Sequence, residues 1–114
     1  MEIIRVFQII AAIGTIITGL VSTLRPRSVF GFTGLSAPGA RGITEIRAIL
    51  GGVFIGLGLA PFILNTQAAY RTLGITYLVI GIIRAISIFV DHSAEQSNLI
   101  SLIVEIIFGV ILVL

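Results

Sequence analysis

Residues 43–61 read "ITEIRAILGGVFIGLGLAP", an apolar, glycine-rich stretch with Glu45 and Arg47 near its beginning. About 20 apolar residues are enough to cross a hydrocarbon core of roughly 30 Å as a helix. Similar stretches flank this one, and together they predict helices over about residues 3–24, 43–64, 69–90 and 97–114. The sequence therefore predicts an all-α polytopic membrane protein, with residues 1–114 forming a single four-helix transmembrane domain.

The composition supports a membrane protein and excludes several other classes. The chain has 114 residues, of which 57% are hydrophobic and 11% are charged, whereas soluble domains carry roughly 25% charged residues. It has no cysteine, which excludes disulfides, a thiolate nucleophile and cysteine-ligated metals. The arginines are scattered and the net charge is only +2, so we expect no nucleic-acid partner.

The connecting segments constrain how the helices follow one another. Residues 25–42 contain prolines, glycines and two phenylalanines, a mixture that is typical of a short segment in the membrane interface. The turn at 65–68 is so short that the second and third helices must be antiparallel neighbours. A polar loop, "DHSAEQSN" at 91–98, leads into the last helix.

Four charged residues fall inside the predicted spans: Glu45, Arg47, Arg84 and Glu105. A charge near the bilayer centre costs roughly 2.5–3.5 kcal/mol, so these residues are expected to pair as an intramembrane polar cluster. Glu45 and Arg47 point roughly 200° apart on a helix and do not face each other. Arg47 with Glu105 and Glu45 with Arg84 is one matching, and the exchanged matching is equally allowed. Because its two charges point to different neighbours, the second helix is expected to be central.

Small residues recur along the spans at the spacing that lets helix backbones approach closely. On the second helix, Ala48, Gly52, Gly56 and Ala60 recur every four residues. The helix-packing glycines predicted from such patterns are Gly51, Gly52, Gly56, Gly81 and Gly109. Polar residues also form stripes on the third and fourth helices, which predicts a polar pocket on the side of the 25–42 and 91–98 loops. The charged cluster can serve this pocket or can simply fix the helix register.

The stretch around Glu45 resembles a family of small four-helix bacterial membrane proteins of unknown function, broadly similar to the DoxX-like group. The resemblance rests on Glu-x-Arg-Ala-x-x-Gly-Gly in the second helix, and it spans nearly the whole chain. The residues that carry it are Pro26, Glu45, Arg47, Ala48, Gly51, Gly52, Arg84 and Glu105. Leu50 stands where the family usually has an aromatic residue. The resemblance implies the four-helix fold and a polar cluster, and it implies no activity.

Two functions remain open. The short loops and the lack of a catalytic constellation favour an accessory or scaffolding subunit that packs against a larger membrane complex. The alternative is a protein that handles a ligand, a lipid or quinone, or an ion in a buried Glu/Arg pocket. A carboxylate held by arginine is a poor general base, so we expect no enzyme, no catalytic residues and no metal site. The expected partners are the lipid bilayer and other integral membrane subunits, in a bacterial inner or other internal membrane; the sequence indicates no particular cofactor.

Overall fold

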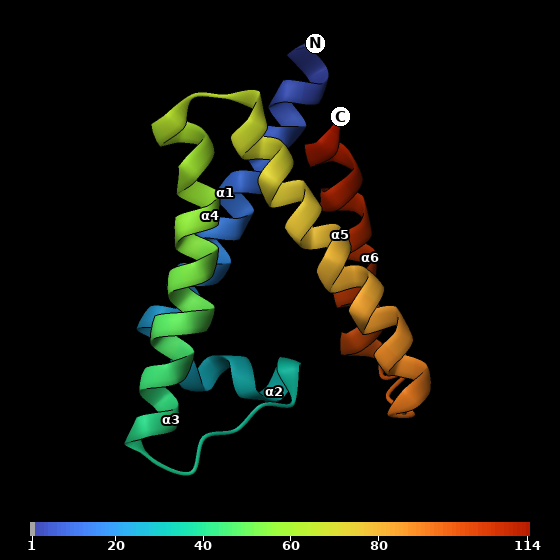
Figure 1. The fold of residues 1–114 in the computed structure, drawn as a ribbon. Helices are drawn as coiled ribbons and strands as arrows, with labels where there is room; N and C mark the ends of the chain where they lie inside the picture. Colours follow the sequence, from blue (N-terminus) through green and yellow to red (C-terminus); the bar gives the residue numbers. More distant parts are fainter. Residues whose placement is uncertain (1) are drawn as a thin grey trace.

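The computed structural model describes residues 2–114, which form four long helical spans joined by shorter segments (Figure 1). The first span is α1, Glu2–Leu24, and the third and fourth are α5, Gln67–Val90, and α6, Gln96–Val113. The second is continuous through α3 (Ala40–Glu45), the π-helical η2 (Ile46–Gly51) and α4 (Gly52–Leu64). All four spans are long and apolar enough to cross a membrane, which confirms the predicted fold class.

Local signals set the helix boundaries between α4 and α5. Asn65 adopts a left-handed φ of 52° and ends α4, as asparagine and glycine commonly do after a helix. Thr66 then caps α5, because its Oγ1 accepts a hydrogen bond from the Ala69 backbone N–H at 3.3 Å. Pro61 lies inside α4 without ending it, as its position near the end of the span predicts. The α4–α5 turn is therefore short, and its two helices are antiparallel neighbours.

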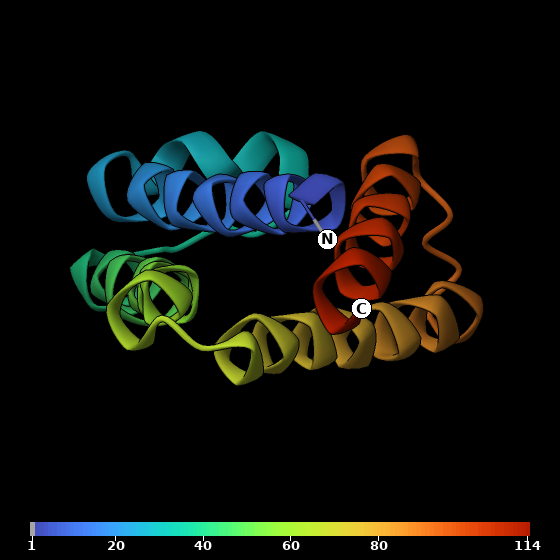
Figure 2. The same cartoon turned by 90° about the horizontal axis from the view of Figure 1, so that it is seen from above.

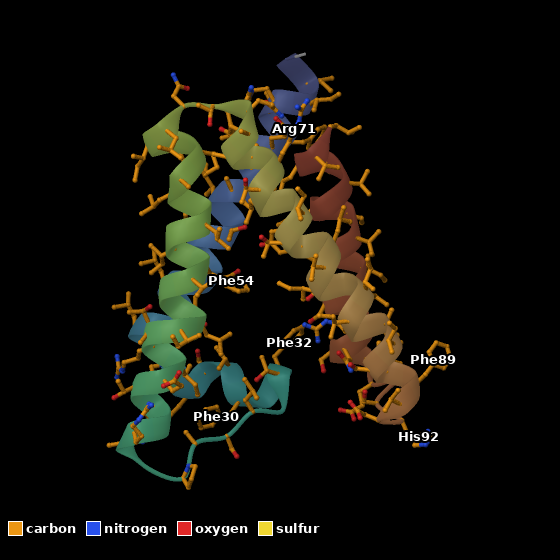
Figure 3. The ribbon with its side chains drawn as sticks, in the orientation of Figure 1. Phe30, Phe32, Phe54, Arg71, Phe89 and His92 are labelled. Atoms are coloured by element: carbon orange, nitrogen blue, oxygen red, sulfur yellow. The ribbon has the colours of Figure 1, made fainter. Side chains whose placement is uncertain are left out.

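The segment between the first two spans contains a short helical piece. A 3₁₀ turn, η1, covers Pro26–Val29 and continues into α2, Phe30–Thr33. Pro26 stands at the first helical position, where its missing N–H is not needed. Gly34 ends α2 with a φ of 74°, a conformation that glycine adopts readily. The predicted short segment therefore forms, and Figure 3 places its Phe30 and Phe32 below the space between the long helices.

The four spans form two helix pairs that meet at one end and diverge at the other. In one pair, α1 packs along η2 and α4; in the other, α5 packs along α6. The pairs approach each other at the end that carries the α4–α5 turn, and α2 lies near the open end (Figure 1). Seen from above, α5 and α6 lie beside each other and apart from much of α4 (Figure 2).

α1, and not the second span, is the helix that packs against all the others. It contacts η2 and α4 along their length and also contacts α5 and α6. The expectation that the second helix is central is therefore wrong. The prediction assumed that Glu45 and Arg47 bind two different neighbouring helices. Glu45 instead finds its partner in the second span itself, and Arg47 binds the end of α1.

The buried core is small and lies near the closed end of the molecule. Its members come from α1, α5 and α6: Ala11, Ala12, Tyr70, Leu73, Tyr77 and Leu112. The Tyr77 hydroxyl and Thr15 Oγ1 are 2.6 Å apart, and this buried hydrogen bond links α5 to α1. Large apolar side chains are exposed along every span, which suits helices surrounded by lipid.

Candidate functional site

A groove of about 780 Å³ lies between the two helix pairs, toward the end where they diverge. This volume is in the range of roughly 300–1,000 Å³ that is usual for small-molecule sites. α2 and the residues after it form the base of the groove, while η2, α5 and the start of α6 form its walls. Its position agrees with the polar pocket that the stripes on the third and fourth helices predict.

The lining of the groove has an apolar part and a polar part, called the apolar wall and the polar wall below, and α5 contributes side chains to both. Its apolar side chains come from α2 and the segment after it, from η2 and from α5: Phe32, Leu35, Leu50, Ile80 and Ile83. Polar side chains reach it from the second half of α5, the 91–95 loop and the start of α6: Arg84, Ser87, Asp91, Ser93, Glu95, Ser97, Asn98 and Ser101. Such a site suits a molecule with one polar and one apolar part.

The polar wall is organised by an ion pair between α5 and α6. Arg84 Nε donates to Glu105 Oε1 at 2.8 Å and to Oε2 at 3.0 Å, and Arg84 Nη2 donates to Oε2 at 2.8 Å. The Glu105 side chain is 9% exposed, whereas that of Arg84 is 33% exposed. A bidentate pair of this kind holds both side chains in one geometry.

Asn98 extends this pair toward the loop. Arg84 Nη1 donates to Asn98 Oδ1 at 2.8 Å, and Asn98 Nδ2 donates to the Ser93 carbonyl at 2.9 Å. Three of the five N–H groups of Arg84 are thereby used, which leaves two for a molecule in the groove. The chain Glu105–Arg84–Asn98–Ser93 thus connects the interior of the α5–α6 pair to its loop.

Helix periodicity explains why these residues meet. Asn98 and Glu105 are seven residues apart, so they lie on one face of α6, two turns from each other. Gly81 lies opposite Glu105 on α5, where a methyl group would be 3.6 Å from Glu105 Cβ and 3.1 Å from Ile106 Cδ1. The small residue lets α6 come close, and Arg84, one turn further along α5, then reaches Glu105.

The other two predicted cluster residues lie elsewhere. Glu45 pairs with Arg41 on its own helix, with Arg41 Nη1 and Glu45 Oε1 2.5 Å apart and side chains 82% and 53% exposed. Arg47 Nη1 donates to the Thr23 carbonyl at 2.6 Å, at the C-terminal end of α1. The matching of Arg47 with Glu105 and Glu45 with Arg84 is therefore wrong, and of the exchanged matching the pair Arg84–Glu105 forms. Of the four residues, Arg84 and Glu105 are together, and neither Glu45 nor Arg47 is among the described residues that line the groove.

Arg47 and Thr23 form a reciprocal link that the sequence did not reveal. Thr23 Oγ1 donates to the Arg47 carbonyl at 3.3 Å while Arg47 donates to the Thr23 carbonyl. The carbonyls at the end of a helix lack partners within it, and a cation there is favoured by the helix dipole. Arg47 lies in the π-helical η2, a local irregularity that no residue pattern predicted.

The predicted packing glycines divide into two groups. Gly51, Gly81 and Gly109 lie in helix interfaces, because a methyl group at each would contact Thr23, Ile106 and Leu78, respectively. Gly52 and Gly56 lie on an exposed face, where a methyl group would meet nothing within 4 Å. The prediction that these two pack against another helix of the chain is wrong. The interface glycines it omitted are Gly14, Gly19, Gly58 and Gly74.

The described residues contain no group of three or more His, Cys, Asp or Glu side chains arranged to hold a metal ion. His92 lies in the loop after α5, exposed and with a left-handed φ of 52°. In Figure 3 it points away from the space between the helix pairs, as does Phe89. The chemistry available in the groove is therefore that of Arg84, Asn98, several serine hydroxyls and two loop carboxylates, which can bind a polar group through hydrogen bonds.

Comparison with known proteins identifies the family and leaves the function open. No curated protein and no solved structure matches the chain. A family model, described as a domain of unknown function, matches residues 3–114. This match confirms the predicted membership of an unknown-function family over nearly the whole chain. The chain belongs to the family described as Domain of unknown function (DUF4345).

Proposed function

We propose that the protein binds an amphiphilic molecule from the bilayer in the groove between its two helix pairs. The observation that carries this proposal is the contrast between the two walls of a groove of about 780 Å³. The polar part of the molecule lies against Arg84, Asn98 and the serines, and its apolar part lies against Leu50, Ile80 and Ile83. Ligand sites combine apolar surface with polar groups that fix the orientation of the ligand, and this groove offers both, with more polar than apolar side chains.

The depth of the groove supports a membrane-derived ligand. Arg84 lies six residues before Val90, the last residue of α5, and therefore about 9 Å inside the end of the span. Ile80 lies one turn deeper on the same helix and belongs to the apolar part of the lining. A molecule with its head at Arg84 and its chain beside Ile80 would match the polarity gradient of one bilayer leaflet. It would enter sideways from lipid, because the helix pairs diverge on this side (Figure 1).

The proposed role is binding without chemical conversion, so the protein is not an enzyme. Arg84 is held by Glu105 and Asn98, and Glu105 is buried behind it. These residues position a donor, and we assign the free acceptors of the groove, Asp91 and Glu95, to binding the polar part of the ligand rather than to general-base catalysis. No cofactor is required for this role.

Native mass spectrometry of the protein extracted in mild detergent tests the proposal. We expect the wild type to retain an amphiphile bound to each chain, and Ser87→Phe to lose it, because a phenyl ring at a groove-lining position fills the site. Ile86→Phe is the matched control, since Ile86 is 60% exposed on the same helix and outside the groove lining. Equal retention by wild type and Ser87→Phe would contradict the proposal.

A role as an accessory or scaffolding subunit is the second candidate, and one observation favours it. Ala48, Gly52 and Gly56 form a face of the second span that is exposed, and a methyl group at either glycine would meet nothing within 4 Å. Small residues four positions apart are what allow membrane helices to approach closely. A helix of a larger membrane complex is the partner we propose for this face.

Gly56→Leu separates this candidate from the first. We expect the wild type to co-purify stoichiometrically with a larger assembly, and Gly56→Leu to leave it while remaining folded, because this position is exposed and a Cβ there meets nothing within 4 Å. Ile82→Leu, at an exposed position on α5, is the control and should stay in the assembly. Migration of the wild type as a monomer or small homo-oligomer in native gels would contradict the accessory role.

We further propose the setting that the family resemblance implies. The protein acts in a bacterial inner membrane, or in another internal membrane, and its fold is related to the DoxX-like group through the Glu-x-Arg-Ala-x-x-Gly-Gly stretch. Four apolar spans support a multi-pass protein in contact with lipid. The kind of membrane that holds the protein and its relationship to the DoxX-like group stay predictions.

A further inference from the structure

We infer that the groove selects an amphiphile with an uncharged, hydroxyl-bearing head, such as a glycosyl diacylglycerol, and discriminates against anionic lipids. This inference rests on the proposed binding function and adds the chemical class of the ligand. It is carried by the charges and free hydrogen-bonding groups of the polar wall, which differ from those of an anion site.

The positive charge in the groove is already neutralised. Arg84 is the arginine among the described lining residues, and its guanidinium is bound by both carboxylate oxygens of Glu105. Two further carboxylates, Asp91 and Glu95, line the same groove and are exposed. A phosphate head would therefore face an arginine that is already paired and two like charges, and like charges brought together across an interface are unfavourable.

The remaining groups suit a head that both donates and accepts hydrogen bonds. Arg84 retains two N–H donors, and the hydroxyls of Ser87, Ser97 and Ser101 form no hydrogen bond with another described residue. The carboxylates of Asp91 and Glu95 only accept, so they need donors. A sugar or glycerol hydroxyl can donate to a carboxylate and accept from a guanidinium at once. A head with several hydroxyls thus satisfies both ends of the polar wall.

Fluorescence quenching measures this selectivity directly. The chain has no tryptophan, so Leu35→Trp places the one tryptophan of the chain in the groove lining, and Phe89→Trp places it on the outer surface at the same end. The protein is reconstituted in vesicles that contain phosphatidylcholine and one brominated test lipid. The test lipids are monoglucosyl diacylglycerol, phosphatidylethanolamine and phosphatidylglycerol with identical brominated chains.

We expect the glucosyl lipid to quench Leu35→Trp at a concentration about tenfold lower than phosphatidylglycerol does, equivalent to about 1.4 kcal/mol. Phe89→Trp should show no such preference. Stronger quenching by phosphatidylglycerol or by phosphatidylethanolamine than by the glucosyl lipid would overturn the inference and leave the binding function standing. Equal quenching of both fluorophores by every lipid would instead contradict the binding function itself.

Removal of the two carboxylates tests the cause of the selectivity. Asp91→Asn with Glu95→Gln, in the Leu35→Trp background, should bring phosphatidylglycerol to within about threefold of the glucosyl lipid, because the like charges are gone. Both positions are exposed, so the fold should be retained, which circular dichroism verifies. Unchanged discrimination in this variant would refute the proposed role of Asp91 and Glu95.

Discussion

Glu105→Gln is expected to lower the free energy of unfolding by about 2–4 kcal/mol, the largest effect of a single polar substitution in the chain. Glu105 accepts hydrogen bonds from Arg84 Nε and Nη2 and is 7% exposed as a residue. Gln keeps the shape and removes the negative charge, which leaves a guanidinium unpaired inside a helix pair. Unfolding in mixed micelles of mild detergent and sodium dodecyl sulfate, followed by circular dichroism, measures the loss.

Replacement of both partners by leucine distinguishes loss of the ion pair from loss of packing. Arg84→Leu with Glu105→Leu removes both charges, and we expect it to be more stable than Glu105→Gln, since replacing both partners of a buried pair by apolar residues is often neutral. The alternative explanation, that Glu105 is needed only for its volume, predicts no loss in Glu105→Gln, because Gln keeps the shape. A double variant as unstable as the single one would therefore contradict the pairing argument.

The exposed pair on the second span provides a control within the same chain. Glu45→Gln removes the partner of Arg41, but both side chains are more than half exposed. Surface ion pairs are worth about 0–1 kcal/mol, so we expect a loss in that range. Glu45 and Glu105 are both acidic residues within predicted spans, and a similar loss at the two positions would show that burial does not set their contribution.

Glu45 forms an exposed pair and Glu105 a buried one, and this difference shows which features the sequence could predict. Length and hydropathy place all four spans, because crossing the hydrocarbon core is a requirement that each segment meets alone. Pairing of charges depends on where neighbouring helices lie. Glu105 shares a face with Asn98 and lies opposite Gly81, a pattern that the stripes on α5 and α6 already contained. Glu45 had an alternative partner, Arg41, four residues earlier on the same helix, and that spacing could have predicted the pair.

The face that the second span turns toward α1 was harder to predict. Its glycines form more than one possible stripe, since Gly52 and Gly56 are four residues apart, while Gly51 and Gly58 are separated by seven. Both spacings return to one helix face, so periodicity alone cannot choose between them. The stripe in contact with α1 contains Gly51 and Gly58, and the π-helical turn at η2 adds an irregularity that residue types do not encode.

Gly58→Ala is expected to destabilise the protein by about 1–3 kcal/mol, because it overfills a tight part of the α1–α4 interface. The added methyl group would lie 2.7 Å from Ile16 Cγ1, 2.9 Å from the Ala12 carbonyl oxygen and 3.1 Å from the Ile16 backbone N. The Ile16 side chain can rotate, but two of these atoms belong to the backbone of α1, so the helices themselves must separate. The same unfolding measurement reports the loss.

Gly56→Ala is the matched control, since it makes the same chemical change two residues earlier in α4. A methyl group there meets nothing within 4 Å, and alanine favours a helix over glycine, so we expect no loss and a gain of up to about 1 kcal/mol. The sign of the effect should therefore reverse between the two positions. If both substitutions stabilised the protein, α1 and α4 would not be in backbone contact, and the divergence of the two helix pairs that creates the groove would lose its structural basis.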